Sequence, residues 1–352
     1  MSKFWSPVVR ALSPYTPGEQ PRVDGLIKLN TNEHPLSPSP HALDAMRGQV
    51  GEGLRRYPDP DATALREAIA QTEQLDISQV FVGNGSDEVL AHCFQALLAG
   101  QERLAIPDIT YSFYPVWAGL YGVSMLPLAL QPDFSVDIDA FAGTEAPIIL
   151  ANPNAPTGIA LSLTDVARLV GARADRLVVI DEAYFGFGAD TAARLLSEFD
   201  NLLITRSLSK SHALAGLRVG YALGSPELIE GLVRVKDSFN SYPIDAVAQA
   251  GAAAAITDRE WFLESAATVC SNRTRLTEGL TALGFEVCPS QANFVFATHS
   301  TQPGAAIFQH LRESNILVRR WDKPRIADHL RISVGTEAEC DRLLDCLRRF
   351  LH

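Results

Sequence analysis

The chain has 352 residues, of which 47% are hydrophobic, so it is long enough to form two domains with buried cores. Acidic residues outnumber basic residues by 41 to 30, which gives a formal net charge of -11 at pH 7. A chain this acidic, without a basic block, is poorly suited to bind nucleic acid or anionic lipid. Any anionic ligand must therefore be held by a few cations placed close to it.

The N-terminus and the cysteines favour an intracellular protein. The opening residues, MSKFWSPVVRALSPY, contain prolines and charges where a signal peptide needs an unbroken apolar run. No segment has the length and apolar character needed to span a bilayer. The five cysteines lack CxxC spacing, which favours free thiols in a reducing compartment. We therefore expect a cytoplasmic protein with no membrane or nucleic-acid partner.

Three segments differ in composition. Residues 1–45 are rich in proline, so we expect them to run extended as an arm that contacts the small domain and a second subunit. Residues 46–240 alternate short apolar runs with amphipathic helical patterns. Residues 241–352 begin with helical patterns and then return to short apolar runs, which predicts a smaller α+β domain.

The middle segment predicts an α/β domain with a mostly parallel sheet flanked by helices. Its runs IIL, LVVI and LLI are apolar at every position, as in strands covered on both faces. In such sheets, ligands bind at the carboxyl ends of the strands, so the polar residues that follow each run are candidates for a site. The predicted strands cover residues 80–82, 103–106, 124–128, 147–151, 177–180, 202–205 and 217–223.

Two loops after predicted strands offer backbone structure suited to a site. The segment GNGSDE, residues 83–88, precedes a predicted helix, whose N-terminal N–H groups and dipole suit a phosphate. A plain strand–helix turn with a serine cap explains it as well. The segment NPNAPTG, residues 152–158, is fixed by two prolines and a glycine, as either the wall of a site or an ordinary turn.

Two further strand ends carry ionisable side chains. Asp181 ends the run LVVID, where it either caps the next turn or pairs with a protonated ring nitrogen or a metal. Lys210 follows the run LLIT together with two serines and with Arg218. Hydroxyls and a guanidinium can hold a phosphate, and a desolvated lysine can become a nucleophile. A single lysine in a loop is otherwise a solvated surface charge.

Taken together, these motifs resemble the fold-type I aminotransferases that depend on pyridoxal 5′-phosphate, and in particular the histidinol-phosphate aminotransferase family. The resemblance covers nearly the whole chain, and the block SLSK…LAGLR…G joined to DEAY is its most specific part. The matching blocks are LNTNEHP (29–35), RYPDP (56–60), GNGSDE (83–88), TYSFYP (110–115), NPNAPTG (152–158), DEAYFGF (181–187), SLSKSHALAGLRVGYALG (207–224) and LRISVG (330–335).

The resemblance implies a role for each residue of the cofactor site. Lys210 would bind the cofactor covalently and then move a proton between the substrate and the cofactor, while the cofactor absorbs electrons. Asp181 would pair with the ring nitrogen, Tyr184 would contact the ring 3′ oxygen, and Tyr111 would stack on the ring. The phosphate would be held by Gly85, Ser86, Asp87, Ser207, Ser209 and Arg218.

The resemblance also implies a homodimer with shared active sites. Tyr57 would reach the cofactor of the partner subunit. Arg331 would bind the carboxylate of glutamate or 2-oxoglutarate, and Arg319 would join it when the substrate carries a phosphate. Tyr15 and Asn32 would line the substrate side.

Two positions depart from the family pattern. The family usually has asparagine immediately before Pro156, where it contacts the ring 3′ oxygen, and here that residue is Ala155. Either Asn154 replaces it or Tyr184 makes the contact alone. His34 stands where the family motif NENP has its second asparagine. Both departures concern substrate and ring contacts rather than the lysine.

We therefore predict an aminotransferase that converts L-histidinol phosphate and 2-oxoglutarate to imidazole-acetol phosphate and L-glutamate, in histidine biosynthesis. Aromatic amino acids are a second possible substrate class, because apolar pockets discriminate weakly between similar side chains. A decarboxylase of a phosphorylated amino acid would share every cofactor residue. A non-catalytic nucleotide-binding or regulatory module is the alternative from another class, and it predicts loss of Lys210 or Asp181.

Overall fold

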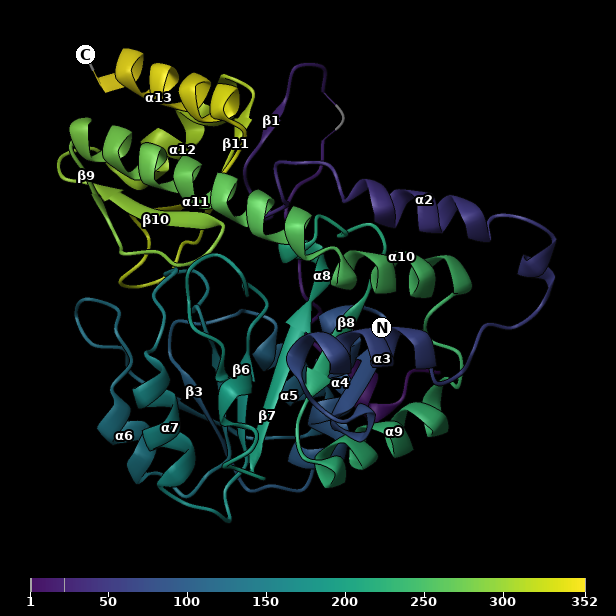
Figure 1. The fold of residues 1–352 in the computed structure, drawn as a ribbon. Helices are drawn as coiled ribbons and strands as arrows, with labels where there is room; N and C mark the ends of the chain where they lie inside the picture. Colours follow the sequence, from purple (N-terminus) through teal and green to yellow (C-terminus); the bar gives the residue numbers. More distant parts are fainter. Residues whose placement is uncertain (1, 22, 352) are drawn as a thin grey trace.

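The computed structural model describes residues 2–21 and 23–351. A large sheet and a smaller sheet are each packed against helices, and α11 runs from the small sheet towards α10 beside the large one (Figure 1). No helix within these described residues has the length and apolar character required to cross a membrane.

The large sheet has seven strands in the order β2-β8-β7-β6-β5-β3-β4. Its strands are parallel except β8, which is antiparallel to both β2 and β7. This confirms the predicted mostly parallel sheet, and each predicted run overlaps one of its strands. The strands are β2 (Val80–Gly83), β3 (Leu104–Pro107), β4 (Met125–Leu128), β5 (Ile148–Ala151), β6 (Val178–Asp181), β7 (Leu202–Ser207) and β8 (Gly220–Leu223).

The central strands are apolar throughout because successive side chains enter two different cores. Val178 and Ile180 of β6 belong to one core, whereas Val179 between them belongs to the core on the opposite face. Helices α2 (Pro40–Gln49), α3 (Thr63–Glu73), α6 (Ile138–Gly143), α7 (Leu163–Gly171) and α10 (Ala246–Thr257) contribute to the first core. Helices α4 (Gly85–Cys93), α5 (Tyr114–Tyr121) and α9 (Pro226–Phe239) contribute to the second.

The small sheet has four antiparallel strands in the order β12-β13-β10-β9, covered by three helices. Short β1 (Ile27–Lys28) pairs with β11 (Ile316–Leu317), so the N-terminal segment is joined to the C-terminal part of the chain. The predicted domain limits at residues 45 and 240 stay a prediction. The elements are β9 (Phe285–Val287), β10 (Phe294–His299), β12 (Arg319–Arg320), β13 (His329–Ser333), α11 (Arg259–Ala282), α12 (Gly304–Glu313) and α13 (Glu337–Leu351).

The N-terminal segment differs from the extended run that its prolines suggested. Helix α1 (Pro7–Ala11) and helix α2 (Pro40–Gln49) each have proline in the first turn. Proline is well tolerated there, because its missing N–H would have no partner within the helix. Ser6 and Ser39 cap the two helices by accepting a hydrogen bond from a backbone N–H.

Candidate active site

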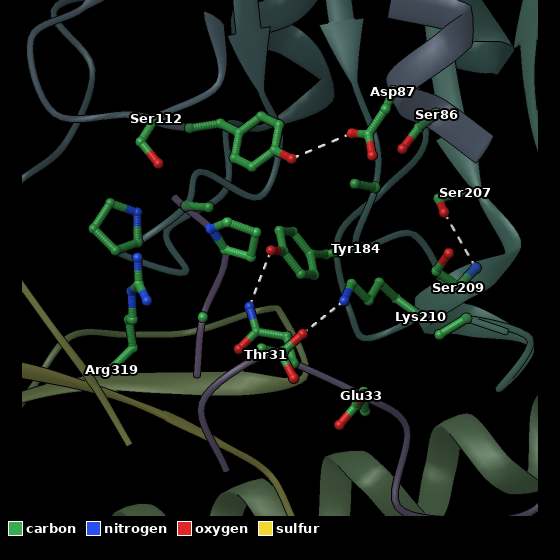
Figure 2. A pocket seen from close by; sticks show the side chains of 18 of the residues that line it. Thr31, Glu33, Ser86, Asp87, Ser112, Tyr184, Ser207, Ser209, Lys210 and Arg319 are labelled. Carbon is green, nitrogen blue, oxygen red and sulfur yellow. Dashed lines mark hydrogen bonds between the residues drawn. The ribbon is translucent and has the colours of Figure 1, made fainter. Parts of the chain in front are cut away.

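A cavity of about 480 Å³ lies at the carboxyl ends of the large-sheet strands, and the small sheet and the N-terminal segment complete its wall. The strand order brings β5, β6 and β7 side by side, so the residues that follow them meet at this edge (Figure 2). The predicted site residues that line it are Tyr15, Asn32, Ser86, Asp87, Tyr111, Asp181, Tyr184, Ser207, Ser209, Lys210, Arg218, Arg319 and Arg331.

Asp181 is the last residue of β6 and is 3% exposed. It accepts hydrogen bonds from the Tyr114 hydroxyl at 2.8 Å, the Thr205 hydroxyl at 3.2 Å and the Ala183 backbone N–H at 3.2 Å. Burial raises the pKa of Asp181 to about 6, because the three donors offset only part of the desolvation cost. A carboxylate placed this way would be stabilised by a cation in the cavity.

Lys210 lies on the short helix α8 (Leu208–Ser211), which begins where β7 ends. Its Nζ donates a hydrogen bond to the Thr31 backbone carbonyl at 2.7 Å. Burial, and then the nearby charge of Arg331, lower the pKa of Lys210 to about 8. A larger fraction of this amine is therefore neutral, and nucleophilic, at neutral pH than for an exposed lysine.

A group of hydrogen-bond donors lies beside Lys210, and we call it the cup. It consists of the Ser207 and Ser209 hydroxyls, the Arg218 guanidinium and the backbone N–H groups at Ser86. The Arg218 guanidinium donates to the Ser209 hydroxyl at 3.3 Å, and the residue lies in the left-handed region with φ of 57°. The cup depends on two glycines, because a Cβ on Gly85 would collide with Arg218 and one on Gly220 would collide with the backbone of Ser86. The Ser86 end of the cup is the first turn of α4, where backbone N–H groups attract an anion.

Asp87 joins this cup to an aromatic side chain. Its carboxylate pairs with Arg218 at 3.3 Å and accepts a hydrogen bond from the Tyr111 hydroxyl at 3.3 Å. Burial, and then the charge of Asp87, raise the pKa of Tyr111 well above its ordinary value. Tyr111 therefore stays neutral and presents its ring to the cavity.

The N-terminal segment reaches the cavity through Asn32, which has φ of 53°. The Asn32 side-chain amide donates to the Tyr184 hydroxyl at 3.0 Å, and its side-chain oxygen accepts from the Ser333 hydroxyl at 3.0 Å. The Asn293 side chain donates to the Asn32 carbonyl at 2.9 Å. Asn32 thus joins the end of β13 to Tyr184 in the wall of the cavity.

Arg319 and Arg331 enter the cavity from the small sheet. The Arg331 guanidinium donates to the Asn30 carbonyl at 2.8 Å, and its buried Nε has no hydrogen-bond partner within residues 2–21 and 23–351. Burial lowers the pKa of Arg331 below its ordinary value. Figure 2 shows Arg319 on the side of the cavity opposite Ser207 and Ser209. The cavity therefore has two cationic ends.

Three predicted residues lie outside the residues that line the cavity. Gly85 lies against the Arg218 guanidinium, which leaves no room for a Cβ there. The Asn154 amide is bonded to the Ile109 carbonyl and to two threonine hydroxyls, and a cofactor contact by Asn154 stays a prediction. Tyr57 is 80% exposed and stacks on Tyr242 at a centroid distance of 4.6 Å.

The two departures from the family pattern have different settings. Ala155 lines the cavity and is 3% exposed. His34 lies outside the cavity lining and packs against Trp261 at a centroid distance of 5.7 Å. Burial lowers the pKa of His34 to about 4, so its imidazole is neutral at pH 7.

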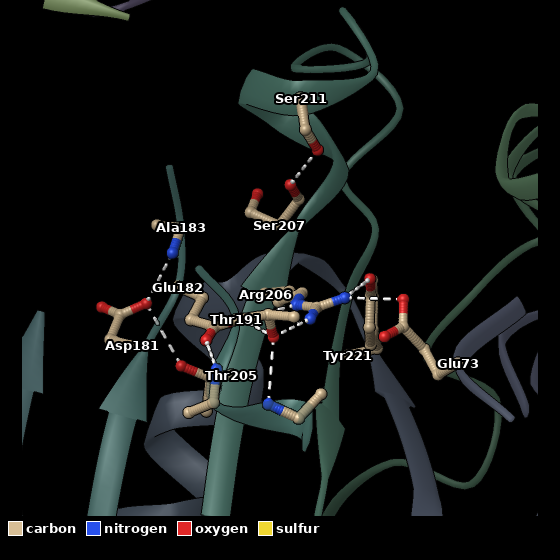
Figure 3. A network of polar contacts seen from close by, with 12 residues as sticks. Glu73, Asp181, Glu182, Ala183, Thr191, Thr205, Arg206, Ser207, Ser211 and Tyr221 are labelled. Carbon is tan, nitrogen blue, oxygen red and sulfur yellow. Dashed lines mark hydrogen bonds and ion pairs between the residues drawn. The ribbon is translucent and has the colours of Figure 1, made fainter. Parts of the chain in front are cut away.

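A second group of polar side chains lies on the reverse face of the same strand ends (Figure 3). Arg206 is 1% exposed and bonds to Glu182 at 2.9 Å and to Glu73 at 2.7 Å. Its remaining contacts are with Thr191 at 2.6 Å, with Tyr221 at 3.1 Å and with the Phe185 ring at 3.7 Å from the centroid. We call Glu73, Glu182, Thr191, Arg206 and Tyr221 the reverse-face cluster.

Several residues of the site were given no role by the sequence. Tyr114 and Thr205 hold Asp181, but a tyrosine in a helix and a threonine in an apolar strand are ordinary core residues. Thr31 contributes only a backbone carbonyl. Trp321 comes directly after β12, a strand too short to recognise from the sequence. In extended backbone, positions two apart point to the same side, so the spacing of Arg319 and Trp321 was the one available signal.

The cavity residues fit pyridoxal 5′-phosphate. The cup that Gly85 and Gly220 keep open suits a phosphate, and the buried Asp181 suits a protonated ring nitrogen. Lys210 is a partly desolvated amine between these two points, and Tyr111 offers a ring face. The cup, Asp181 and Lys210 therefore match the phosphate, the pyridinium and the aldehyde of one molecule.

The chain matches the family model "Aminotransferase class I and II" over residues 24–347. It is 57% identical over 351 residues to a histidinol-phosphate aminotransferase of Gluconacetobacter diazotrophicus, covering 100% of this chain and 99% of that protein. It is 56% identical over 351 residues to histidinol-phosphate aminotransferase 1 of Bradyrhizobium diazoefficiens, covering 100% of each.

A solved structure has the same fold. The histidinol-phosphate aminotransferase of Sinorhizobium meliloti, crystallised with pyridoxal 5′-phosphate, superposes with a TM-score of 0.88 over 99% of both chains at 23% identity. The family uses pyridoxal 5′-phosphate, which confirms the expected cofactor. The chain belongs to the class I and II aminotransferases and, within them, to the histidinol-phosphate aminotransferase family.

Proposed function

We propose that the protein transfers the amino group of L-histidinol phosphate to 2-oxoglutarate, giving imidazole-acetol phosphate and L-glutamate in histidine biosynthesis. One observation carries the proposal: the cavity has two cationic ends, with Lys210 and Asp181 between them. The cup at one end suits the cofactor phosphate, which leaves Arg319 and Arg331 for an anionic substrate. The names of relatives that are more than 50% identical support the same substrate.

Residues of the large domain would hold and polarise the cofactor. When bound, pyridoxal 5′-phosphate accepts the amino group and absorbs the electron pair released at the substrate α-carbon. Asp181 would keep the ring nitrogen protonated, and its own pKa would fall because the pyridinium is a buried cation beside it. Tyr111 would fix the ring plane, and Tyr184, held by Asn32, would bond to the ring 3′ oxygen.

Lys210 would move the proton of the reaction. Once its amine is free, Nζ would remove the proton from the substrate α-carbon and deliver it to C4′ of the cofactor. The Thr31 carbonyl accepts a hydrogen bond from Nζ at 2.7 Å, which gives the free amine a fixed place in the wall of the cavity. The lowered pKa suits a base that works near neutral pH.

Arg331 would bind the substrate anion in both half-reactions, and Arg319 would join it when the substrate carries a phosphate. The Nε of Arg331, which lacks a partner among the described residues, offers a donor that a carboxylate or phosphate would satisfy. A guanidinium binds either anion through paired N–H groups, so one pocket serves L-glutamate and L-histidinol phosphate. Tyr15 and Asn32 would close the substrate side of the cavity.

The family membership also supports a homodimer with shared sites. Tyr57 and Tyr242 are 80% and 42% exposed, and they form an aromatic surface outside their own cavity. Tyr57 would reach the cofactor phosphate of the partner subunit. Mixing Lys210→Ala and Tyr57→Ala subunits would then restore activity, because some sites combine wild-type residues from both chains. No recovery above the separate variants would contradict a shared site. A cytoplasmic location stays a prediction.

Steady-state kinetics test the substrate. We expect kcat/KM to be largest for L-histidinol phosphate, with smaller values for L-phenylalanine and L-tyrosine, which lack the phosphate. A larger kcat/KM for an aromatic amino acid would overturn the substrate assignment. Carbon dioxide released from a phosphorylated amino acid, in place of its 2-oxo acid, would overturn the reaction type.

A further inference from the structure

Arg319 and Arg331 occupy an electrostatically unfavourable position. They are direct cross-strand partners in the antiparallel pair β12–β13. Like charges opposite each other on neighbouring strands destabilise a sheet. Arg319 takes part in no ion pair or side-chain hydrogen bond with any residue in the described ranges 2–21 and 23–351. Some other interaction must keep its guanidinium in the cavity.

Trp321 supplies that interaction. It lines the cavity two residues after Arg319, and the Cζ atoms of Arg319 and Arg331 lie 5.6 Å and 5.2 Å from the centroid of its ring. The face of an indole attracts cations, and tryptophan does so more strongly than tyrosine or phenylalanine. One ring therefore attracts both guanidiniums and offsets part of their mutual repulsion.

The two arginines are not equally dependent on Trp321. Arg331 also donates to the Asn30 carbonyl at 2.8 Å and lies 5.5 Å from the Phe294 ring. For Arg319 the indole of Trp321 is the only such contact among the described residues. Removing the indole would therefore release Arg319 and leave Arg331 largely in place.

We propose that Trp321 is a positioning residue that sets the preference for phosphorylated substrates, an inference that rests on the proposed function. A phosphate monoester carries a charge near -2, whereas a carboxylate carries -1. The dianion needs both guanidiniums on one side of the cavity, and a carboxylate needs only Arg331. Trp321 thus matters more for L-histidinol phosphate than for L-glutamate.

The test compares Trp321→Leu, which removes the π face, with Trp321→Phe, which keeps one. For Trp321→Leu we expect KM for L-histidinol phosphate to rise about tenfold, and KM for L-glutamate to rise less than about threefold. The effect should fall on KM rather than kcat. Trp321→Phe should keep most of the phosphate preference. An equal rise for both substrates, or equal effects of the two variants, would overturn the proposal by indicating a packing role.

A double-mutant cycle tests whether Trp321 acts through Arg319. In an Arg319→Ala background, Trp321→Leu should raise KM for L-histidinol phosphate by less than about twofold more. Additive effects would contradict the assignment. Melting temperatures of all variants, measured with cofactor, identify any loss of folding.

A binding experiment separates this proposal from the proposed function. Phenyl phosphate and benzoate are dead-end ligands of similar shape, and calorimetry on the cofactor-loaded protein measures their affinities without turnover. Trp321→Leu should weaken phenyl phosphate about tenfold and benzoate much less. Wild-type protein that fails to convert L-histidinol phosphate would refute the proposed function, whereas an unchanged preference in the variant would refute the role of Trp321.

Discussion

At the carboxyl ends of β6 and β7, buried charges are paired within the protein on one face of the sheet and, in the described part of the chain, left without a charged partner on the other. In the reverse-face cluster, Arg206 is bonded to Glu182, Glu73, Thr191 and Tyr221, so its charge is compensated within the protein. On the cavity face, Asp181 has only neutral donors among the described residues, and Arg319 of β12, across the cavity, has only an aromatic ring. The residues that alternate along the same two strands thus divide into a structural set and a ligand-binding set.

This difference indicates how to recognise a site from charge alone. A buried ionised group costs several kcal/mol unless it is paired. Where the protein supplies the partner, the pair fixes the structure. Where it does not, the group is available to a ligand of opposite charge. Each experiment below changes one face and asks whether the effect falls on folding or on ligand binding.

The largest effect is expected for Lys210→Ala. Loss of both the covalent link and the proton-transferring amine should lower kcat by about 10⁴-fold or more, while the variant still folds. The measurement is the steady-state rate with L-histidinol phosphate, with thermal melting as the folding control. Activity within tenfold of wild type would remove the assigned role.

Arg206→Met is expected to lower the stability of the fold rather than to affect ligand binding. It leaves Glu182 buried without its cation, which should reduce the free energy of unfolding by about 3–5 kcal/mol. Urea unfolding of the cofactor-free protein measures this, and the matched control is Arg206→Met combined with Glu182→Gln, which should recover part of the loss. A change below about 1 kcal/mol would show that the reverse-face cluster contributes little to stability.

Asp181→Asn should raise the stability of the cofactor-free protein and lower its affinity for the cofactor. The pKa of Asp181 is raised to about 6 in the folded protein, so its contribution to stability is present below about pH 4 and is lost as pH rises to 6. At pH 7 the cofactor-free variant should therefore be more stable than wild type by about 3 kcal/mol.

The same change should weaken cofactor binding. Loss of a charge-assisted hydrogen bond to the ring nitrogen corresponds to an affinity about 10–100-fold lower. Fluorescence titration with pyridoxal 5′-phosphate, alongside urea unfolding, measures both properties. A variant that is less stable and binds the cofactor normally would place Asp181 in the structural set.

The smallest expected effect is the pH dependence of the rate of cofactor uptake. Uptake of the cofactor by cofactor-free protein requires neutral Lys210, so the rate should fall about tenfold per pH unit below the pKa of about 8. Stopped-flow absorbance between pH 6 and 9 gives the midpoint. Arg331→Met should move that midpoint upward, because the second cause of the lowered pKa is the charge of Arg331. A midpoint near 10 in wild type would contradict the buried position of the amine.

The strands and the motif residues could be predicted from the sequence, because both depend on local patterns. Apolar runs identified every strand of the large sheet, and polar residues at their ends identified Asp181 and Lys210. The start of β8 was placed too early, at residue 217 rather than at Gly220. Arg218 adopts a left-handed conformation there, which an extended strand cannot include.

The supporting contacts could not be predicted, because they join positions far apart in the chain. Arg331 bonds to the Asn30 carbonyl across 301 residues, and Tyr114 reaches Asp181 across 67. Arg319 and Arg331 were recognised by their motifs, but their direct opposition on paired strands depends on the register of the small sheet. That register is what gives Trp321 its proposed role.

The most direct test locates the bound cofactor. The chain has five lysines, at positions 3, 28, 210, 236 and 323, so borohydride reduction of the cofactor-loaded protein followed by peptide mapping distinguishes every candidate. We predict one pyridoxyl group per chain, on Lys210. A label on another lysine, or none on a protein that binds the cofactor, would contradict the arrangement of Lys210 and Asp181 around one heterocycle.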